Sequence, residues 1–180
     1  MANHKKSAAA PRHEAHDGKT ADERAASLTQ FELALVVANN AFEQWVSRCG
    51  AAAGGGGFAS LDLLVLSNVN HRLRDKRVVD ICFAMKVEDS HTVAYSLKKL
   101  GNAGLVSSQR NGKETRFATT DAGKKLCDDY YKVRRKFLVE SLSVLAEDEL
   151  DLEAVAARLR VLSGLYEQAA RNAATASEGS

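Results

Sequence analysis

The middle of the chain holds the residues whose chemistry is most informative. On a helix that turns about 100° per residue, Val93, Leu97 and Leu100 fall within about 60° of one another and define a buried face. The opposite face carries donors, acceptors and one aromatic ring, the groups that read base edges in the major groove of DNA. This face, its start and its edges consist of Ser90, His91, Thr92, Tyr95, Lys98, Lys99 and Asn102. The same pattern is also typical of an amphipathic helix whose polar face only meets water.

A charged hairpin is predicted directly after this helix. Residues 105–108 and 116–119 have the composition of two short strands, and the residues between them include Asn-Gly, the strongest short hairpin signal. Four side chains near the turn can contact phosphates or the minor groove: Arg110, Asn111, Lys113 and Arg116. A charged turn that is merely solvated is the alternative, and the neighbouring helices favour the DNA-binding interpretation.

The elements before the hairpin predict how these side chains are positioned. Val78–Met85 is an apolar run expected to form a helix, and Lys86–Asp89 is a polar turn that ends in a capping residue. Ser90–Leu100 is then a second helix that ends at Gly101. Two helices joined by a turn and followed by a basic hairpin predict a winged helix-turn-helix.

Further helices are predicted on both sides of this region. Thr20–Glu23 has the pattern of a capping box and starts a helix that Gly50 is expected to stop. The segment 51–57 contains four consecutive glycines and is expected to be a flexible connector, after which Ser60 caps a helix that runs to about Leu73. Two more helices are expected over about 120–145 and 148–173.

The predicted fold class is therefore mainly α with a small β-hairpin wing. We predict a disordered tail (1–19), a dimerisation helix (20–50), a winged helix-turn-helix DNA-binding domain (58–119), C-terminal dimerisation helices (120–173) and a second disordered tail (174–180). Composition agrees with a helical protein, because aromatic residues make up only 6% of the chain and it has one proline.

The charge distribution indicates a polyanionic partner for the middle of the chain. Between His71 and Arg116 ten basic residues stand against five acidic ones, a net charge of +5. From Phe137 to the end three basic residues stand against eight acidic ones, a net charge of −5. This asymmetry is expected when only one part of a protein touches nucleic acid, and double-stranded DNA is the predicted partner.

The sequence predicts no enzyme, no cofactor and no metal site. It has no phosphate-binding loop, GxSxG, HExxH or GxGxxG motif, and His71 and His91 have no nucleophile motif near them. Cys49, Cys82 and Cys127 are far apart and show no metal-ligand spacing, so reduced, buried thiols are expected. A redox-sensing cysteine remains an alternative.

No membrane association is expected either. The sequence has no apolar run long enough to span a bilayer, and its polar beginning lacks the apolar centre of a signal peptide. The predicted location is the cytoplasm.

The middle of the chain resembles the bacterial MarR family of transcription regulators. The resemblance rests on Val78-Val-Asp-Ile-Cys-Phe-Ala-Met, Thr92-Val-Ala-Tyr-Ser-Leu-Lys-Lys-Leu, Gly104-Leu-Val and Thr119-Thr-Asp-Ala-Gly-Lys124, and it covers about Ser60–Lys136. It departs from the family at Tyr95, where members often carry Arg, and in a shorter wing, so it does not give the operator sequence. The pattern VNHR…DICF…YSLKKL also resembles a branch that regulates cell-wall L,D-transpeptidase genes.

This resemblance implies a homodimer and a small-molecule effector. The first, fifth and sixth helices of the family form the dimer, and the apolar stripe Leu126, Tyr130, Val133 and Phe137 agrees with that role. The family's effector pocket lies between the dimer region and the winged domain, where Phe42, Trp45, Asn68 and His71 are the candidate lining residues. Trp45 is equally compatible with an ordinary core role. A protein-binding winged helix without DNA activity is the remaining alternative.

Overall fold

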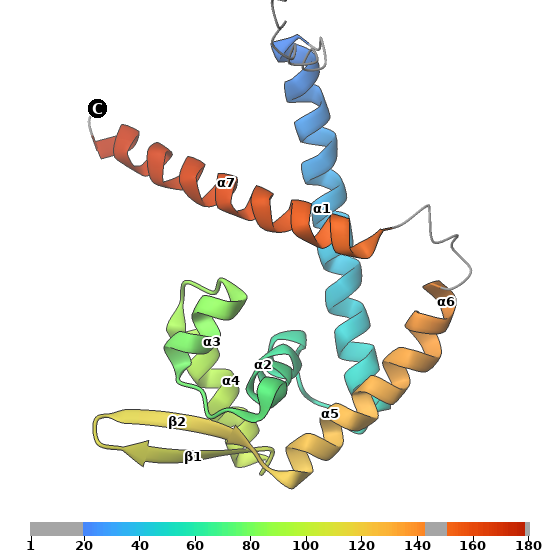
Figure 1. Ribbon diagram of the computed structural model, residues 1–180, viewed down its shortest axis with the longest axis vertical. Helices are drawn as coiled ribbons and strands as arrows, with labels where there is room; N and C mark the ends of the chain where they lie inside the picture. Colours follow the sequence, from blue (N-terminus) through green and yellow to red (C-terminus); the bar gives the residue numbers. More distant parts are fainter. Residues whose placement is uncertain (1–19, 143–150, 179–180) are drawn as a thin grey trace, which may run out of the picture. The chain divides into compact units, whose positions relative to one another are not determined.

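The computed structural model describes residues 20–142 and 151–178 (Figure 1). The chain divides into two units, one ending at Trp45 and one beginning at Val46, and each is described by itself. The predicted tail 1–19 lies outside the described residues, as do residues 143–150 and 179–180.

The first helix, α1, spans Ala21–Ala52. Its start confirms the predicted capping box: the Thr20 N–H donates to Glu23 Oε2 (2.7 Å), and the Glu23 N–H donates to Thr20 Oγ1 (3.2 Å). The prediction that Gly50 stops the helix is wrong, because Gly50 is a buried residue inside it. A Cβ at Gly50 would lie 2.2 Å from Leu63 Cδ1, so the glycine allows α1 to pack closely against the next helix. Gly54, at φ +96°, follows the helix end.

Three short helices follow, and the second and third of them form the predicted helix-turn-helix. They are α2 (Ser60–Asn70), which continues into a 3₁₀ turn over His71–Leu73, α3 (Val78–Met85) and α4 (Ser90–Asn102). Ser60 was predicted to cap α2, but it is the first residue of the helix. The Asp62 carboxylate accepts a hydrogen bond from the Ala59 N–H at 2.9 Å. Asp89 caps α4 as predicted, since its carboxylate accepts from the His91 N–H at 2.9 Å.

The hairpin consists of β1 (Val106–Asn111) and β2 (Glu114–Thr119), paired antiparallel from Val106↔Thr119 to Asn111↔Glu114. Its strands are longer than predicted, and Gly112 and Lys113 alone form the turn. Gly112 has φ +62°, the conformation that the first position of a two-residue hairpin turn commonly needs. Lys76 adds an isolated bridge to β2 through two backbone hydrogen bonds with Phe117, of 2.9 and 2.8 Å.

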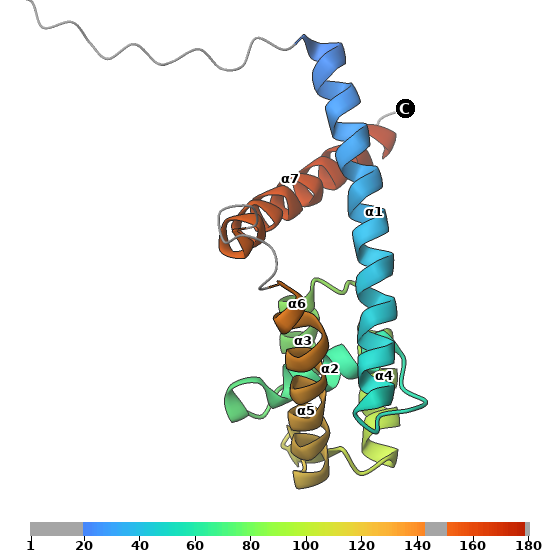
Figure 2. The same cartoon turned by 90° about the vertical axis from the view of Figure 1, so that its right-hand side faces the viewer.

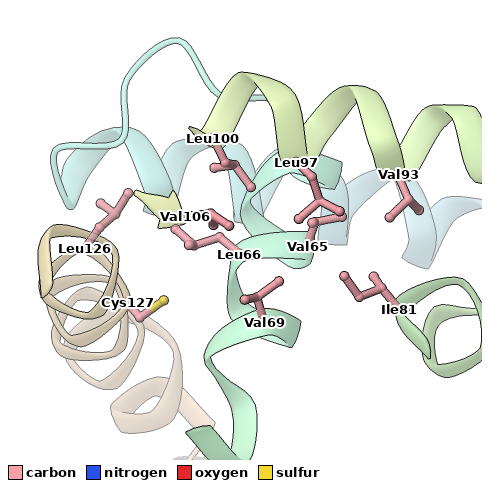
Figure 3. Packing of buried hydrophobic residues seen from close by; sticks show 10 residues of the cluster. All are labelled: Val65, Leu66, Val69, Ile81, Val93, Leu97, Leu100, Val106, Leu126 and Cys127. Carbon is pink, nitrogen blue, oxygen red and sulfur yellow. The ribbon is translucent and has the colours of Figure 1, made fainter. Parts of the chain in front are cut away.

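A single hydrophobic cluster holds these elements together (Figure 3). Side chains from α2 face those of α4, while α3 and α5 supply the two ends of the cluster. The ten buried residues are Val65, Leu66, Val69, Ile81, Val93, Leu97, Leu100, Val106, Leu126 and Cys127. Burial of this apolar surface is the main force that fixes α4 against α2.

The C-terminal part is helical. Helix α5 (Asp121–Arg134) starts at Thr120, whose hydroxyl accepts from the Gly123 N–H at 3.1 Å. It continues through a π-helical turn (Arg135–Val139) into α6 (Glu140–Leu142), so the three pieces form one rod (Figure 2). The last helix, α7, spans Leu152–Glu178 and therefore extends through five residues that were predicted as a tail. Alanines dominate the end of α7, and alanine is the strongest helix former.

Candidate nucleic-acid interface

The burial of α4 confirms the face predicted from helical angles. Val93, Leu97 and Leu100 are 0, 2 and 0% exposed, and they point toward α2 (Figure 3). Because these three residues fix the inner face, the side chains on the opposite face must point into solvent. The cap formed by Asp89 sets where the helix begins and hence which residues occupy its first turn.

The outward face of α4 carries side chains that are free to bind a ligand. His91, Tyr95, Lys98 and Asn102 are all exposed, and Tyr95 is 70% exposed despite its large apolar ring. Within the described part of the chain the Tyr95 hydroxyl and the Lys98 ammonium make no hydrogen bond or ion pair. A ring, a phenol and a cation on one exposed face provide stacking, hydrogen-bonding and charge contacts for a nucleic acid.

The predicted edge residues differ from one another in their surroundings. Ser90 and Thr92 are exposed in the first turn of α4, and the Thr92 hydroxyl donates to Asp89 Oδ2 at 3.1 Å. Lys99 is half-buried, and its ammonium donates to Asp62 Oδ2 at 2.7 Å and to the Gly57 carbonyl at 2.9 Å. The structure therefore brings six of the seven predicted α4 residues to an exposed surface, while Lys99 interacts with the protein itself.

The wing presents two of its predicted cations at the turn. Lys113 is exposed at the tip and has no hydrogen-bond or ion-pair partner among the described residues. Arg110 is exposed and uses only its Nε, which donates to the Gly112 carbonyl at 3.3 Å. Asn111, also exposed, is the last residue of β1. Both cations are available for phosphate groups.

Arg116 belongs instead to an ion-pair network, here called the wing clamp, that consists of Arg77, Asp80, Glu114 and Arg116. The Arg77 guanidinium contacts Asp80 Oδ1 at 2.8 Å and Glu114 Oε1 at 2.9 Å, and Arg116 contacts Glu114 Oε2 at 3.2 Å. The wing clamp thus joins the start of α3 to β2. Sequence reasoning missed Arg77; its spacing of three from Asp80 at a helix start was the only local signal.

The charges of the wing clamp persist at neutral pH. Hydrogen bonds from Arg77 lower the pKa of Asp80 to about 2, and a hydrogen bond from the same guanidinium lowers the pKa of Glu114. Hydrogen bonds to these two carboxylates raise the pKa of Arg77 itself. The clamp therefore needs no pH change to form.

The candidate effector residues are divided between the two units. Phe42 is exposed and Trp45 half-buried in the first unit, whereas His71 is exposed in the second. Asn68 is half-buried, and its side-chain oxygen accepts a hydrogen bond from Lys76 Nζ at 3.2 Å. The structure does not bring these four residues together within one unit, so an effector site at these positions stays a prediction.

Cys49 and Cys127 have the burial that was predicted for all three thiols, but Cys82 does not. Cys49 and Cys127 are buried and Cys82 is half-buried, and all three are reduced. Burial raises the pKa of Cys127 to about 11 and raises that of Cys49, so both thiols stay protonated at neutral pH.

Among residues 20–142 and 151–178 no group of three or more His, Cys, Asp and Glu side chains is arranged to hold a metal ion. No helix in the same ranges combines the length and hydropathy needed to cross a bilayer.

Comparisons with known proteins agree with this geometry. Residues 58–123 match the family model of the winged helix DNA-binding domain. No curated protein matches the chain. Many solved structures share its architecture, and three of them illustrate the likeness. A MarR transcriptional regulator from Methanosarcina mazei Go1 is 19% identical, with a TM-score of 0.61 over 76% of this chain and 90% of that one.

The other two structures match over a larger share of the chain. A MarR family transcription regulator is 14% identical, with a TM-score of 0.66 over 83% of this chain and 97% of that one. A MarR family regulator from Neisseria meningitidis is 16% identical, with a TM-score of 0.64 over 81% of this chain and 97% of that one. The fold is that of the MarR regulators. In this fold α3, α4 and the β1–β2 hairpin form the winged helix-turn-helix predicted from the sequence.

Proposed function

We propose that this protein is a MarR-type transcription regulator that binds specific sequences of double-stranded DNA and has no catalytic activity. One observation carries the proposal: the face of α4 that carries Tyr95 and Lys98, which are exposed and unpaired among the described residues, stands in a winged helix fold whose hairpin presents Arg110 and Lys113. A helix with free polar groups fits the major groove, and a basic hairpin fits the adjacent backbone.

The two elements have different roles in this proposal. His91, Tyr95 and Lys98 contact base edges and so discriminate between sequences. Arg110 and Lys113 contact phosphates or the minor groove and contribute to the affinity for any duplex. Ser90, Thr92 and Asn102 are exposed beside the reading residues and complete the contact surface of α4.

We further propose that the regulator acts as a homodimer. Large apolar side chains are exposed on α1, where Leu33, Val36 and Val37 are 66, 55 and 60% exposed, and on α7, where Val161 is 67% exposed. Apolar surface of this amount on two long helices supports burial against a second copy. A two-fold dimer presents two α4 helices, so the operator is expected to be pseudo-palindromic with half-sites about one helical turn apart.

The targets and the effector follow from the resemblance described above. Promoters of L,D-transpeptidase genes are the first duplexes to test. A small molecule is the proposed effector, with Phe42, Trp45, Asn68 and His71 as its candidate contact residues, and it would alter DNA binding by favouring one conformation of the protein.

Two substitutions test the division of roles. The probes are a duplex selected from a random pool by the wild-type protein and a scrambled duplex of equal composition, each titrated at two salt concentrations. Tyr95→Ala is expected to reduce the preference for the selected duplex by about fivefold or more, because a good base contact provides about 1–3 kcal/mol of discrimination.

Lys113→Ala is expected to weaken binding to both duplexes alike and to lower the salt slope by about 1. If Tyr95→Ala retained the full preference while Lys113→Ala lost it, the assigned roles would be wrong. If the wild-type protein bound neither duplex at low salt, a protein-binding winged helix would replace the proposed function.

A further inference from the structure

A buried polar cluster connects α2 to α4 behind the proposed reading face. Asp62 of α2 is 4% exposed, and Ser96 of α4 is 2% exposed. The Ser96 hydroxyl donates to Asp62 Oδ1 at 2.7 Å, while Lys99 Nζ donates to Asp62 Oδ2 at 2.7 Å. Ser96 and Lys99 are three residues apart and therefore lie on one side of α4. We call Asp62, Ser96 and Lys99 the α2–α4 node.

The Lys99 ammonium is held by partners from three neighbouring positions. Besides Asp62, its Nζ donates to the Gly57 carbonyl at 2.9 Å and lies 5.3 Å from the centroid of the Phe58 ring. An ammonium has three donor hydrogens, so two of them are already used within the protein. The adjacent Lys98 is exposed and has no such partner in the described ranges.

The Asp62 carboxylate is charged in spite of its burial. Burial opposes ionisation, but the hydrogen bonds from Lys99, Ser96 and the Ala59 N–H outweigh it and lower the pKa of Asp62. The hydrogen bonds from Ser96 and Lys99 are directional and depend on the rotation of α4 about its own axis, whereas the bond from the Ala59 N–H lies at the start of α2. Every buried side-chain nitrogen or oxygen within the described residues has a hydrogen-bond partner.

The apolar contacts of α4 restrict its rotation less narrowly than the hydrogen bonds of the node do. Contacts among Val93, Leu97 and their α2 neighbours are non-directional, so they tolerate small rotations at little cost. With side chains, a helix has a radius of about 5–6 Å, so a rotation of about 20° moves the outward side-chain tips by about 2 Å. A hydrogen bond to a base edge tolerates a spread of only about 0.5 Å.

We propose that the α2–α4 node fixes the rotation of α4 against α2 and thereby determines how well the reading face discriminates between DNA sequences. Lys99 is a positioning residue in this arrangement and not a DNA contact, although its position in the sequence suggested one. The inference rests on the proposed DNA-binding function. It also assigns a role to Gly57, because the carbonyl of this connector residue holds the same ammonium.

The test compares two lysines with different proposed roles, and Lys113→Met is the phosphate-contact control for Lys99→Met. Each variant is titrated with the wild-type-selected duplex and its scrambled counterpart over a salt series, after its folding has been verified by urea unfolding. Lys113→Met removes a proposed phosphate contact and is expected to lower the salt slope for scrambled duplex by about 1. Lys99→Met is expected to leave that slope unchanged and to reduce the preference for the selected duplex by about fivefold or more.

Ser96→Ala keeps the test decisive if Lys99→Met folds poorly. Ser96→Ala retains the ion pair and removes one hydrogen bond, and it should also reduce the preference. The combined Asp62→Asn/Lys99→Met variant should lose no more preference than either single variant, because both substitutions break the same interaction.

A salt slope for Lys99→Met that falls by about 1, as expected for Lys113→Met, would identify Lys99 as a phosphate contact and overturn the proposal. Retention of the wild-type preference for the selected duplex, within twofold, in folded Lys99→Met and Ser96→Ala would also overturn the proposal. Absence of duplex binding by the wild-type protein would contradict the proposed function itself. Duplex binding that substitutions in the node leave unchanged would contradict only the role of the node.

Discussion

Gly123 is the third residue of α5, where the helix passes close to the backbone of Leu105, the residue that precedes β1. A Cβ at this position would lie 2.1 Å from the Leu105 carbonyl oxygen and 3.0 Å from its carbonyl carbon. That carbonyl cannot withdraw freely, because it accepts a hydrogen bond from the Thr120 N–H at 3.1 Å. Gly123→Ala must therefore push α5 away from the base of the hairpin.

The expected change in the free energy of unfolding combines two destabilising contributions with one smaller stabilising one. Overpacking against backbone costs about 1–3 kcal/mol, and loss of the Thr120 hydrogen bond adds about 1 kcal/mol. Alanine gains at most about 1 kcal/mol over glycine in helix propensity. We expect the free energy of unfolding to fall by about 1–3 kcal/mol, which for a chain of this length lowers Tm by about 2–4 °C per kcal/mol.

Gly101→Ala is the matched control. Gly101 also lies in a helix of the winged domain, but a Cβ there would be 3.7 Å from its nearest neighbour, the Val106 carbonyl oxygen, which is an ordinary contact. Urea unfolding followed by circular dichroism should show Gly101→Ala to be neutral or up to about 1 kcal/mol more stable than wild type. Equal stability of Gly123→Ala and Gly101→Ala would refute the close approach of α5 to Leu105.

Two further predictions concern the wing clamp and the dimer. Asp80 has a folded pKa of about 2, below its ordinary value of about 3.9, so its pairing with Arg77 stabilises the fold above about pH 4 and is lost as the pH falls toward 2. Arg77→Gln should flatten the loss of stability between pH 4 and 2 in urea unfolding; an unchanged pH profile would contradict the clamp. Deletion of residues from 151 onward, which removes α7, should give a monomer or an aggregate in light scattering, whereas a well-folded truncated dimer would exclude α7 from the interface.

Sequence patterns predicted several features that depend on residues close together in the chain. The inward face of α4 followed from helical spacing at Val93, Leu97 and Leu100, and the Asp89 cap and the Asn-Gly hairpin followed from residue types at fixed offsets. These features arise from backbone geometry within one or two turns, which the sequence records directly.

Features that depend on distant residues were not predictable in the same way. Gly50 was expected to end α1 because glycine usually does, but Leu63 makes a glycine necessary inside the helix. Lys98 and Lys99 are chemically identical neighbours, and only Asp62, 37 residues earlier, distinguishes the half-buried lysine from the free one. Arg77 and Glu114 are likewise separated by 37 residues, so their contact exists only once the hairpin has folded beside α3.

The proposed binding of duplex DNA through α4 and the wing is tested most directly by the salt dependence of the protein's affinity for random duplex DNA. We expect measurable binding at low salt. The logarithm of the association constant should fall linearly with the logarithm of the salt concentration, with a slope of about −0.9 for each phosphate contacted. Absence of binding at low salt, or an affinity that does not change with salt concentration, would contradict it.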